Sequence, residues 1–479
     1  MTNSTSPAGS SPPRVERDSL GELKVPAAAL YGIQTARAIQ NFPVSGLRPM
    51  DAFVEAMVWI KRSAAQVHRE TGRLEPALAD AIVRSADEVL GGEHRDQFVV
   101  DPYQAGAGTS HNMNVNEVLA NRANEILGGR RGEYRPVHPN DHVNMAQSTN
   151  DTIPTAIRLA MLARLPRLLD AMTLLARELQ AKGSEFDGVM KSGRTHLQDA
   201  TPIRLGQEFA AFGGTVERNG ERLQQGSAWL QDLNIGGSAV GTGLNVEPVY
   251  PGRMVTELSK LTGLPLREGR DRVQLMQSMG DFAAVSGLLR SYAVDLGKIA
   301  NDLRLLSSGP RTGLAEIRLP AVQPGSSIMP GKVNPVLAEM TNMVCFQVIG
   351  NDVTVASAAE AGQLELNVMM PVIAHNLLFS VEILTNATHL LAERCVAGIV
   401  ADEEQCAYWL ERSSAIVTAL APRIGYAEAA KLAQEAVRRN MTVRELVEEK
   451  GVLPKHELDA VLDLRAMTDL GVPGDAPES

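Results

Sequence analysis

Apolar residues recur every three or four positions through long stretches of the chain, which is the period of a helix with one buried face. One unbroken stripe consists of Phe282, Val285, Leu289, Tyr292, Leu296, Ile299, Leu303 and Leu306. Similar patterns cover residues 51–90, 157–179, 336–355 and 371–391, whereas the alternation typical of strands is scarce. The pattern predicts a mainly α protein with an elongated central helix bundle. Its stripes exceed what one slender chain can bury, so we expect self-association.

Changes in this pattern along the sequence predict a tail and three domains. Residues 1–14 are rich in Ser, Pro and Gly without an apolar core, which predicts a disordered tail and not a signal peptide. We predict a mainly helical N-terminal domain over residues 15–149 and a central helical-bundle domain over residues 150–400. A small C-terminal helical domain is predicted over residues 401–479, where shorter helical patterns alternate with Gly and Pro turns.

The segment 325–335 concentrates the most unusual chemistry of the sequence. It begins with a pair of hydroxyls at Ser326 and the next residue, and it places a cation at Lys332. Asn334 is predicted to cap a helix that starts at Pro335, with its positive end toward the loop. Five residues separate the two glycines and a valine follows the lysine, so this is not a phosphate-binding loop.

Three further polar loops, over residues 101–111, 138–151 and 191–199, are also predicted to lead into helices. The last two of those helices are expected to begin near Pro154 and Pro202. Hydroxyls, amides and helix N-terminal N–H groups bind carboxylates without many buried charges. Each loop alone is more often only a helix cap, but four in one chain predict a site for a ligand with two carboxylates.

Composition excludes several classes of function. The formal net charge is −10 and basic residues form no block, which argues against a nucleic-acid partner. The three cysteines show neither C-x-x-C spacing nor a nearby histidine pair, so we predict no disulfide framework and no metal site, consistent with a reducing cytoplasm. No apolar run is long enough to span a membrane.

The segment 325–335 resembles the signature of the aspartase/fumarase superfamily. The resemblance extends from about Leu20 to Gly474, and its other motifs lie at residues 108–114, 147–151, 193–199, 239–245 and 365–368. It implies three mainly helical domains, a homotetramer whose central helices form a twenty-helix core, and composite active sites built from three chains. It implies no redox or nucleotide cofactor.

The resemblance also implies a lyase reaction. Such enzymes remove a proton from the carbon beside one carboxylate and expel an amine or water from the next carbon, which leaves fumarate. Proton removal creates an aci-carboxylate, whose extra charge must be stabilised where it develops. Ser326 resembles the catalytic base, with His196 as the alternative base, and Glu339 resembles the acid that holds this histidine.

The carboxylate-binding residues are also implied by the resemblance. The carboxylate remote from the abstracted proton is expected to contact Thr195, His196, Lys332 and Asn334. The carboxylate beside that proton is expected to contact Thr109, Ser148, Thr149 and Ser327. Asn150 resembles a contact to the leaving amino group. His138 belongs to a loop that forms a secondary dicarboxylate site in fumarases, or it is a surface histidine.

Two branches of the superfamily remain open from the sequence. The segment 101–104 and Thr149 are similar to aspartases, whereas Val115 and Thr201 are similar to fumarases. We predict reversible deamination of L-aspartate to fumarate and ammonia, with the class II fumarase reaction on L-malate as the alternative. A non-catalytic structural homologue is the third hypothesis, disfavoured because the residues that resemble the base and the binding lysine are present.

Overall fold

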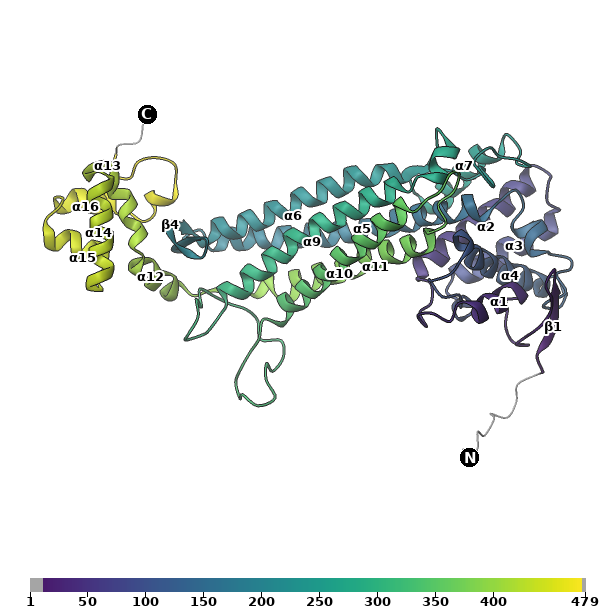
Figure 1. The fold of residues 1–479 in the computed structure, drawn as a ribbon, viewed down its shortest axis with the longest axis horizontal. Coiled ribbons are helices and arrows are strands. Elements are labelled where there is room, and N and C mark those ends of the chain that lie inside the picture. The colour runs from purple at the N-terminus through teal and green to yellow at the C-terminus, as the bar shows by residue number, and fades with distance from the viewer. Residues whose placement is uncertain (1–11, 476–479) are drawn as a thin grey trace. The chain divides into compact units, whose positions relative to one another are not determined.

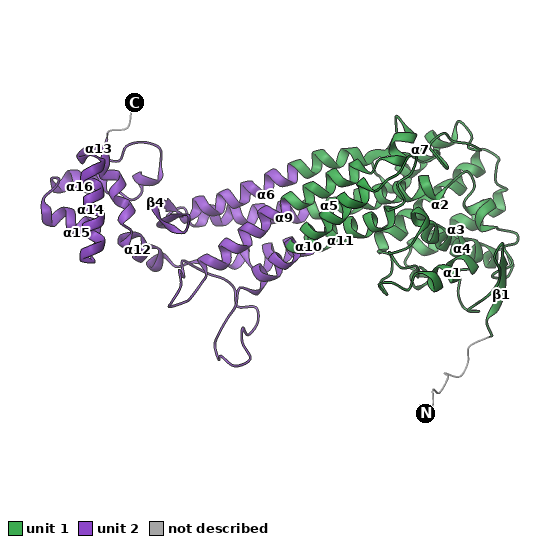
Figure 2. Ribbon diagram, viewed as in Figure 1, with its two compact units in different colours: residues 1–169, 222–291, 346–384 green, residues 170–221, 292–345, 385–479 purple. Residues whose placement is uncertain are grey.

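The computed structural model describes residues 12–475, which belong to two compact units (Figure 2). Unit 1 comprises residues 1–169, 222–291 and 346–384. Unit 2 comprises residues 170–221, 292–345 and 385–479. The tail predicted for residues 1–14 lies outside the described residues up to position 11, and Arg14 already begins a strand. The three-domain division stays a prediction.

Five long helices carry most of the predicted apolar stripes (Figure 1). They are α5 (Thr149–Glu185), α6 (Leu205–Ser227), α9 (Gly280–Leu306), α10 (Val336–Glu360) and α11 (Met370–Arg394). The boundary between the units falls inside each of them. The mainly α prediction is therefore confirmed. Among the described residues, no helix combines the length and the apolar character needed to cross a membrane.

Buried polar contacts join segments of these helices within each unit. In unit 1, the Arg158 guanidinium of α5 donates to Asp281 of α9 at 2.7 Å. In unit 2, the hydroxyls of Tyr292 on α9 and Thr388 on α11 lie 2.8 Å apart. Arg158, Tyr292 and Thr388 are buried, and a buried polar group that lacks a hydrogen-bond partner is costly. They therefore favour one alignment of the helices.

The rest of unit 1 consists of shorter helices and strands, and a buried carboxylate caps the first of these helices. Its helices are α1 (Ile33–Asn41), α2 (Asp51–Glu70), α3 (Pro76–Leu90), α4 (Thr109–Ile126), α7 (Tyr250–Thr262) and α8 (Arg272–Gln277). Its strands are β1 (Arg14–Asp18), β2 (Gly21–Val25), β5 (Asp232–Leu233) and β6 (Arg267–Glu268). The buried Glu117 carboxylate of α4 accepts from the N–H groups of Gly32, Gln34 and Thr35 and from the Thr35 hydroxyl. This carboxylate fixes where α1 begins.

The rest of unit 2 contains two small sheets and a C-terminal helical cluster. Its strands are β3 (Met190–Thr195), β4 (Gln198–Arg204), β7 (Ile317–Arg318) and β8 (Val400–Ala401). Its shorter helices are α12 (Glu403–Arg412), α13 (Ala421–Ile424), α14 (Tyr426–Arg439), α15 (Val443–Lys450) and α16 (Lys455–Val461). Buried leucines and valines between Leu410 and Leu462 form the core of this cluster. A capping box between Thr442 and Glu445 starts α15.

Two predicted boundaries are wrong. Residues 191–199 do not form a loop before a helix at Pro202, because β3 and β4 pair as an antiparallel hairpin and α6 begins only at Leu205. This hairpin depends on buried ion pairs with distant residues, which no local pattern reveals. The helix expected near Pro154 begins earlier, at Thr149, because a proline close to a helix N-terminus removes little hydrogen bonding.

Candidate active site

In unit 1, two predicted binding hydroxyls meet where two helices begin. Thr109 is the first residue of α4 and Thr149 the first residue of α5, and their Oγ1 atoms lie 3.1 Å apart. The chain reaches Thr109 through a left-handed turn, with φ values of 58° at Ala107 and 101° at Gly108. A Cβ at Gly108 would lie 2.9 Å from the Ile153 side chain, so only glycine fits there. The two hydroxyls therefore share a region of positive helix-end potential.

Ser148 and Asn150 flank Thr149 and are held by the same turn. The Ser148 hydroxyl accepts from the Asn150 N–H at 3.2 Å. The Asn150 amide nitrogen donates to the Ala239 carbonyl at 2.8 Å, which leaves its Oδ1 as an acceptor. The structure thus brings together the four binding residues predicted in this unit.

Asp151 is the buried anchor of this turn. Its carboxylate accepts from the N–H groups of Ser148 at 2.9 Å and of Gly236 and Ser238 at 3.0 Å each. Burial raises the pKa of Asp151 to about 6, against the opposing effect of these N–H groups and of Lys61. The carboxylate ties residues 236–238 to the start of α5.

In unit 2, the segment 325–335 is closed at its base and turns tightly around Ser326. The Gly325 N–H donates to the Lys332 carbonyl at 2.8 Å, and the Asn334 amide donates to the Gly325 carbonyl at 2.7 Å. The Ser326 hydroxyl accepts from the N–H groups of Ile328 at 3.2 Å and Met329 at 2.9 Å. We refer to the two contacts of Gly325 as the loop clasp.

The predicted cap of α10 is wrong in its detail. The helix begins at Val336, and the Asn334 side chain serves the loop clasp instead of accepting from helix N–H groups. The Asn334 Nδ2 group donates to the Gly325 carbonyl, and this contact orients the side chain toward the loop. Ser327 and Lys332 have exposed side chains on this loop.

Thr195 and His196 lie at the turn of the hairpin β3–β4. His196 and Leu197 adopt left-handed φ values of 55° and 61°, and the Thr195 and His196 side chains are exposed. Within the single chain that the structure describes, no hydrogen bond joins His196 to Glu339. The expected acid–histidine pair is therefore not formed inside one chain.

A buried ion cluster fixes the hairpin beside this turn. Both Glu316 carboxylate oxygens accept from Arg194 Nη1, at 2.9 and 3.0 Å, and Lys191 Nζ lies 3.3 Å from the same carboxylate. Lys191 also donates to Glu208 at 2.9 Å. The Glu316 side chain is fully buried, so the residue immediately before Thr195 is held by a charge-assisted contact.

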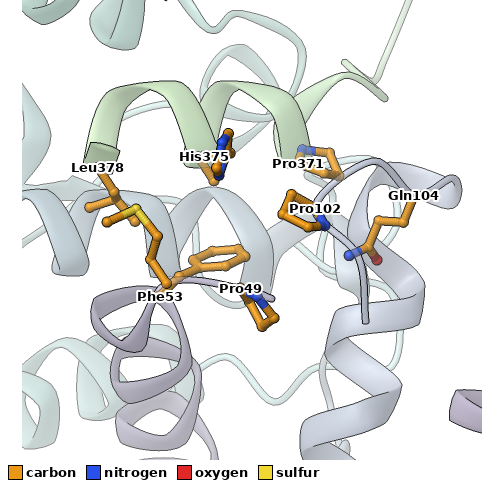
Figure 3. A pocket seen from close by; sticks show the side chains of 9 residues that line it. Pro49, Phe53, Pro102, Gln104, Pro371, His375 and Leu378 are labelled. Carbon is orange, nitrogen blue, oxygen red and sulfur yellow. The ribbon is translucent and has the colours of Figure 1, made fainter. Parts of the chain in front are cut away.

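One cavity in unit 2 and one pocket in unit 1 differ in size, and only the larger is lined by a predicted site residue. A cavity of about 680 Å³ in unit 2 is lined by Lys191, Arg194, His196 and residues of α6 and α9. A pocket in unit 1 of about 20 Å³, lined by Phe53, Gln104 and His375 among others, has none of the predicted site residues (Figure 3). The smaller one has room for about one water molecule, so it cannot hold a dicarboxylate.

Sequence reasoning predicted no metal cluster, but the described residues contain one candidate group, Glu88, Glu93 and His94, whose ligand atoms lie within 4.8 Å. Arg122 already donates to both Glu88 oxygens, so a cation would have to displace a guanidinium. The group does not include any predicted site residue.

His138 has a local capping role. Its Nδ1 atom accepts hydrogen bonds from the backbone N–H groups of Asn140 and Asp141.

Three buried residues that support predicted site residues were missed as functional candidates: Lys61 and Asp151 in unit 1, and Glu316 in unit 2. Lys61 offered a signal, because it occupies a core-facing position between Ile60 and Ala64 on the apolar face of α2. A charged residue at such a position needs a buried partner. Glu316 offered none, because its partners lie more than a hundred residues away in sequence.

The chain matches the family model described as lyase over residues 21–350 and the model described as fumarase C C-terminus over residues 416–469. It is similar to an aspartate ammonia-lyase from Bacillus subtilis (strain 168), with 48% identity over 461 residues that cover 96% of this chain and 97% of that protein. It is similar to a class II fumarate hydratase from Halobacterium salinarum, with 50% identity over 460 residues covering 96% and 98%. The crystal structure of fumarate lyase:delta crystallin from Brucella melitensis bound to cobalt matches with a TM-score of 0.92 and 49% identity, over 96% of this chain and 100% of that one.

Proposed function

We propose that this chain, which belongs to the lyase family whose model spans residues 21–350, catalyses the reversible deamination of L-aspartate to fumarate and ammonia. The observation that carries the proposal is the turn at Ser326, whose Oγ faces two loop N–H groups. A serine is a poor base unless its oxyanion is stabilised. Backbone N–H groups at fixed positions supply that stabilisation at little reorganisation cost.

In the proposed reaction, Ser326 takes the proton from the carbon beside one carboxylate. The electron pair left behind enters that carboxylate and forms the aci-carboxylate. Hydroxyl donors at two helix N-termini, Thr109 and Thr149, stabilise the extra charge together with Ser148 and Ser327. The carbon–nitrogen bond then breaks and ammonia leaves, which produces the double bond of fumarate.

The other carboxylate is proposed to bind Lys332, Asn334, Thr195 and His196. An exposed lysine on a loop can supply a charge-assisted contact once substrate and loop come together. His196 as the base is the alternative. Glu339 is proposed to hold His196 across a subunit boundary.

Asn150 supports ammonia as the leaving group. Its amide nitrogen is committed to the Ala239 carbonyl, so its oxygen is available to accept from a substrate ammonium. The fumarase reaction remains the second candidate, because a class II fumarate hydratase is 50% identical and Val115 and Thr201 resemble that branch.

We further propose that the protein acts as a cytoplasmic homotetramer with composite active sites and a twenty-helix core. Large apolar side chains remain exposed on long helices of the single chain, including Val294 at 54% on α9 and Met343 at 59%, Phe346 at 65% and Val353 at 62% on α10. Burial of such side chains between copies would remove the cost of their exposure to water.

Ultraviolet absorbance of the fumarate double bond tests the reaction. Purified protein is given L-aspartate in one experiment and L-malate in another. A rise with aspartate supports deamination, whereas a rise with malate alone identifies a fumarase. Ser326→Ala should lower kcat by about 100- to 10,000-fold if this serine is the base. Near-normal turnover by a folded variant would eliminate that role.

Subunit complementation tests the composite site. Ser326→Ala and Thr149→Val chains are co-expressed and assayed at an aspartate concentration far below the KM of the second variant. If the two residues of one site come from different chains, mixed tetramers should regain about a quarter of wild-type activity. No recovery in tetramers verified to be mixed would place both residues of a site in one chain.

A further inference from the structure

The Asp151 carboxylate connects the first turn of α5 to the segment 236–239, which belongs to a distant part of the sequence. The side chain is fully buried, and one of its oxygens accepts from the Ser148 N–H at 2.9 Å, as acidic residues in a first helical turn commonly do. Its other oxygen accepts from the N–H groups of Gly236 and Ser238, at 3.0 Å each. Asp151 therefore holds the segment as well as the start of the helix.

Close packing and hydrogen bonds restrict the backbone of the segment 236–239. Gly236 has a left-handed φ of 88°, and a Cβ there would lie 2.6 Å from the Pro251 Cγ atom. The Gly237 carbonyl accepts from the Gly241 N–H at 3.0 Å. The position of the segment thus depends on its contacts with α5 and on the absence of a side chain at Gly236.

The Ala239 carbonyl, at the end of the segment, orients the Asn150 amide. It accepts from Asn150 Nδ2 at 2.8 Å. The opposite amide orientation would place Oδ1 against the carbonyl oxygen, and neither of these two oxygens can donate. Asn150 Oδ1 therefore faces away from the carbonyl, where it can accept from a ligand.

We propose that Asp151 and the segment 236–239 position Asn150 so that its amide oxygen, and not its nitrogen, faces the substrate ammonium group. The inference rests on the proposed function, because it takes L-aspartate as substrate and Asn150 as its ammonium contact. An amide oxygen accepts from an ammonium group, whereas an amide nitrogen would face it donor against donor. Asp151 is a positioning residue that does not touch substrate and acts through the backbone of the segment.

The KM for L-aspartate divided by the inhibition constant for succinate, here called the ammonium ratio, tests the inference. Succinate has both carboxylates and no ammonium group, so damage to carboxylate binding alone leaves the ratio unchanged. Asn150→Ala should raise the ratio about 10- to 100-fold, the usual contribution of a hydrogen bond to a charged group.

Two further variants release the Ala239 carbonyl without changing Asn150. Gly236→Ala displaces the segment from Pro251, and Asp151→Ala removes both acceptor oxygens that hold the segment and the helix start. Each should raise the ammonium ratio about fivefold, because the Asn150 amide loses the hydrogen bond that selects its orientation. In the Asn150→Ala background, either second change should alter the ratio by less than about twofold.

The outcomes separate the inference from the proposed function. No turnover of L-aspartate by the wild-type protein overturns the proposed function and the inference with it. If the wild-type protein deaminates L-aspartate, an unchanged ratio in Asn150→Ala or in folded Gly236→Ala overturns the inference alone. Full multiplicative effects of the second changes in the Asn150→Ala background overturn it as well. If Asp151→Ala does not fold, Gly236→Ala decides by itself.

Matched controls exclude general damage to unit 1. Gly263→Ala places a side chain at a left-handed φ of 72°, as Gly236→Ala does, but its Cβ meets no atom within 4 Å. Asp101→Ala removes another buried carboxylate that accepts from three backbone N–H groups, as Asp151 does. Both controls should lower thermal stability while the ammonium ratio stays within about twofold of the wild-type value. A rise in a control equal to that of its test variant would overturn the inference.

Discussion

The two hydrogen bonds of the loop clasp lead to a quantitative prediction for the kcat/KM of the variant Gly325→Ala. A Cβ at this position would lie 2.7 Å from the Lys332 carbonyl oxygen and 2.8 Å from the Asn334 N atom. Gly325 does not have a left-handed φ, so the expected effect comes from this clash and not from backbone strain. To relieve the clash, the chain must give up the two hydrogen bonds of the clasp, whose lengths are 2.8 and 2.7 Å.

At about 1 kcal/mol for each hydrogen bond, the closed loop loses about 2 kcal/mol relative to open forms. This corresponds to a population roughly 30-fold lower. If Ser326 works as the base only in the closed loop, kcat/KM for L-aspartate should fall by about that factor. The thermal denaturation midpoint should change little, because most side chains from residue 327 to 333 are exposed and contribute little to a core.

Steady-state kinetics and hydrogen exchange of the loop amides measure the two halves of this prediction. The amides of Gly325, Ile328 and Met329 should exchange faster in the variant. Gly188→Ala is the matched control, since a Cβ there meets no atom within 4 Å and its φ is ordinary. Wild-type kcat/KM in Gly325→Ala, despite faster exchange of these amides, would refute the link between the clasp and catalysis.

Three other predictions concern the supporting structure. Glu316→Gln should raise the KM for aspartate and lower the unfolding free energy by about 3 kcal/mol, because Arg194 and Lys191 lose a buried counter-charge; unchanged kinetics and denaturation would refute this. Glu117→Gln should lower the unfolding free energy by about 3 kcal/mol in urea denaturation, since the new amide nitrogen faces the donors that start α1; a loss below about 0.5 kcal/mol would contradict it. Burial raises the pKa of all three cysteines to about 12, so the native protein should resist a thiol reagent at pH 8 and react only after unfolding.

The helical architecture could be predicted because it follows from local periodicity. The stripe from Phe282 to Leu306 became α9 (Gly280–Leu306), and the patterns at 336–355 and 371–391 became α10 and α11 with modest shifts at their ends. Each stripe needs only its own spacing to specify a buried face. The hairpin at residues 190–204 could not be predicted this way, because its buried side chains pair with Glu208 and Glu316 outside the segment.

The candidate site also combines features that the sequence alone predicts with features that only the folded chain determines. The sequence alone determined which loops carry hydroxyls, amides and a lysine, because glycines, prolines and polar runs mark such loops locally. It also determined the family, through motifs distributed over nearly the whole chain. The roles of these residues in catalysis stay predictions until the substitutions are measured.

Only the tertiary structure decided which groups hold the loops in shape. Asn334 became part of the loop clasp and not a helix cap, Glu316 fixed the hairpin that carries His196, and Lys61 was placed against Asn144 and Gln147. These contacts join residues far apart in sequence or compete with a local alternative. Their choice depends on the need of every buried polar atom for a partner, and that need is defined only when the chain has folded.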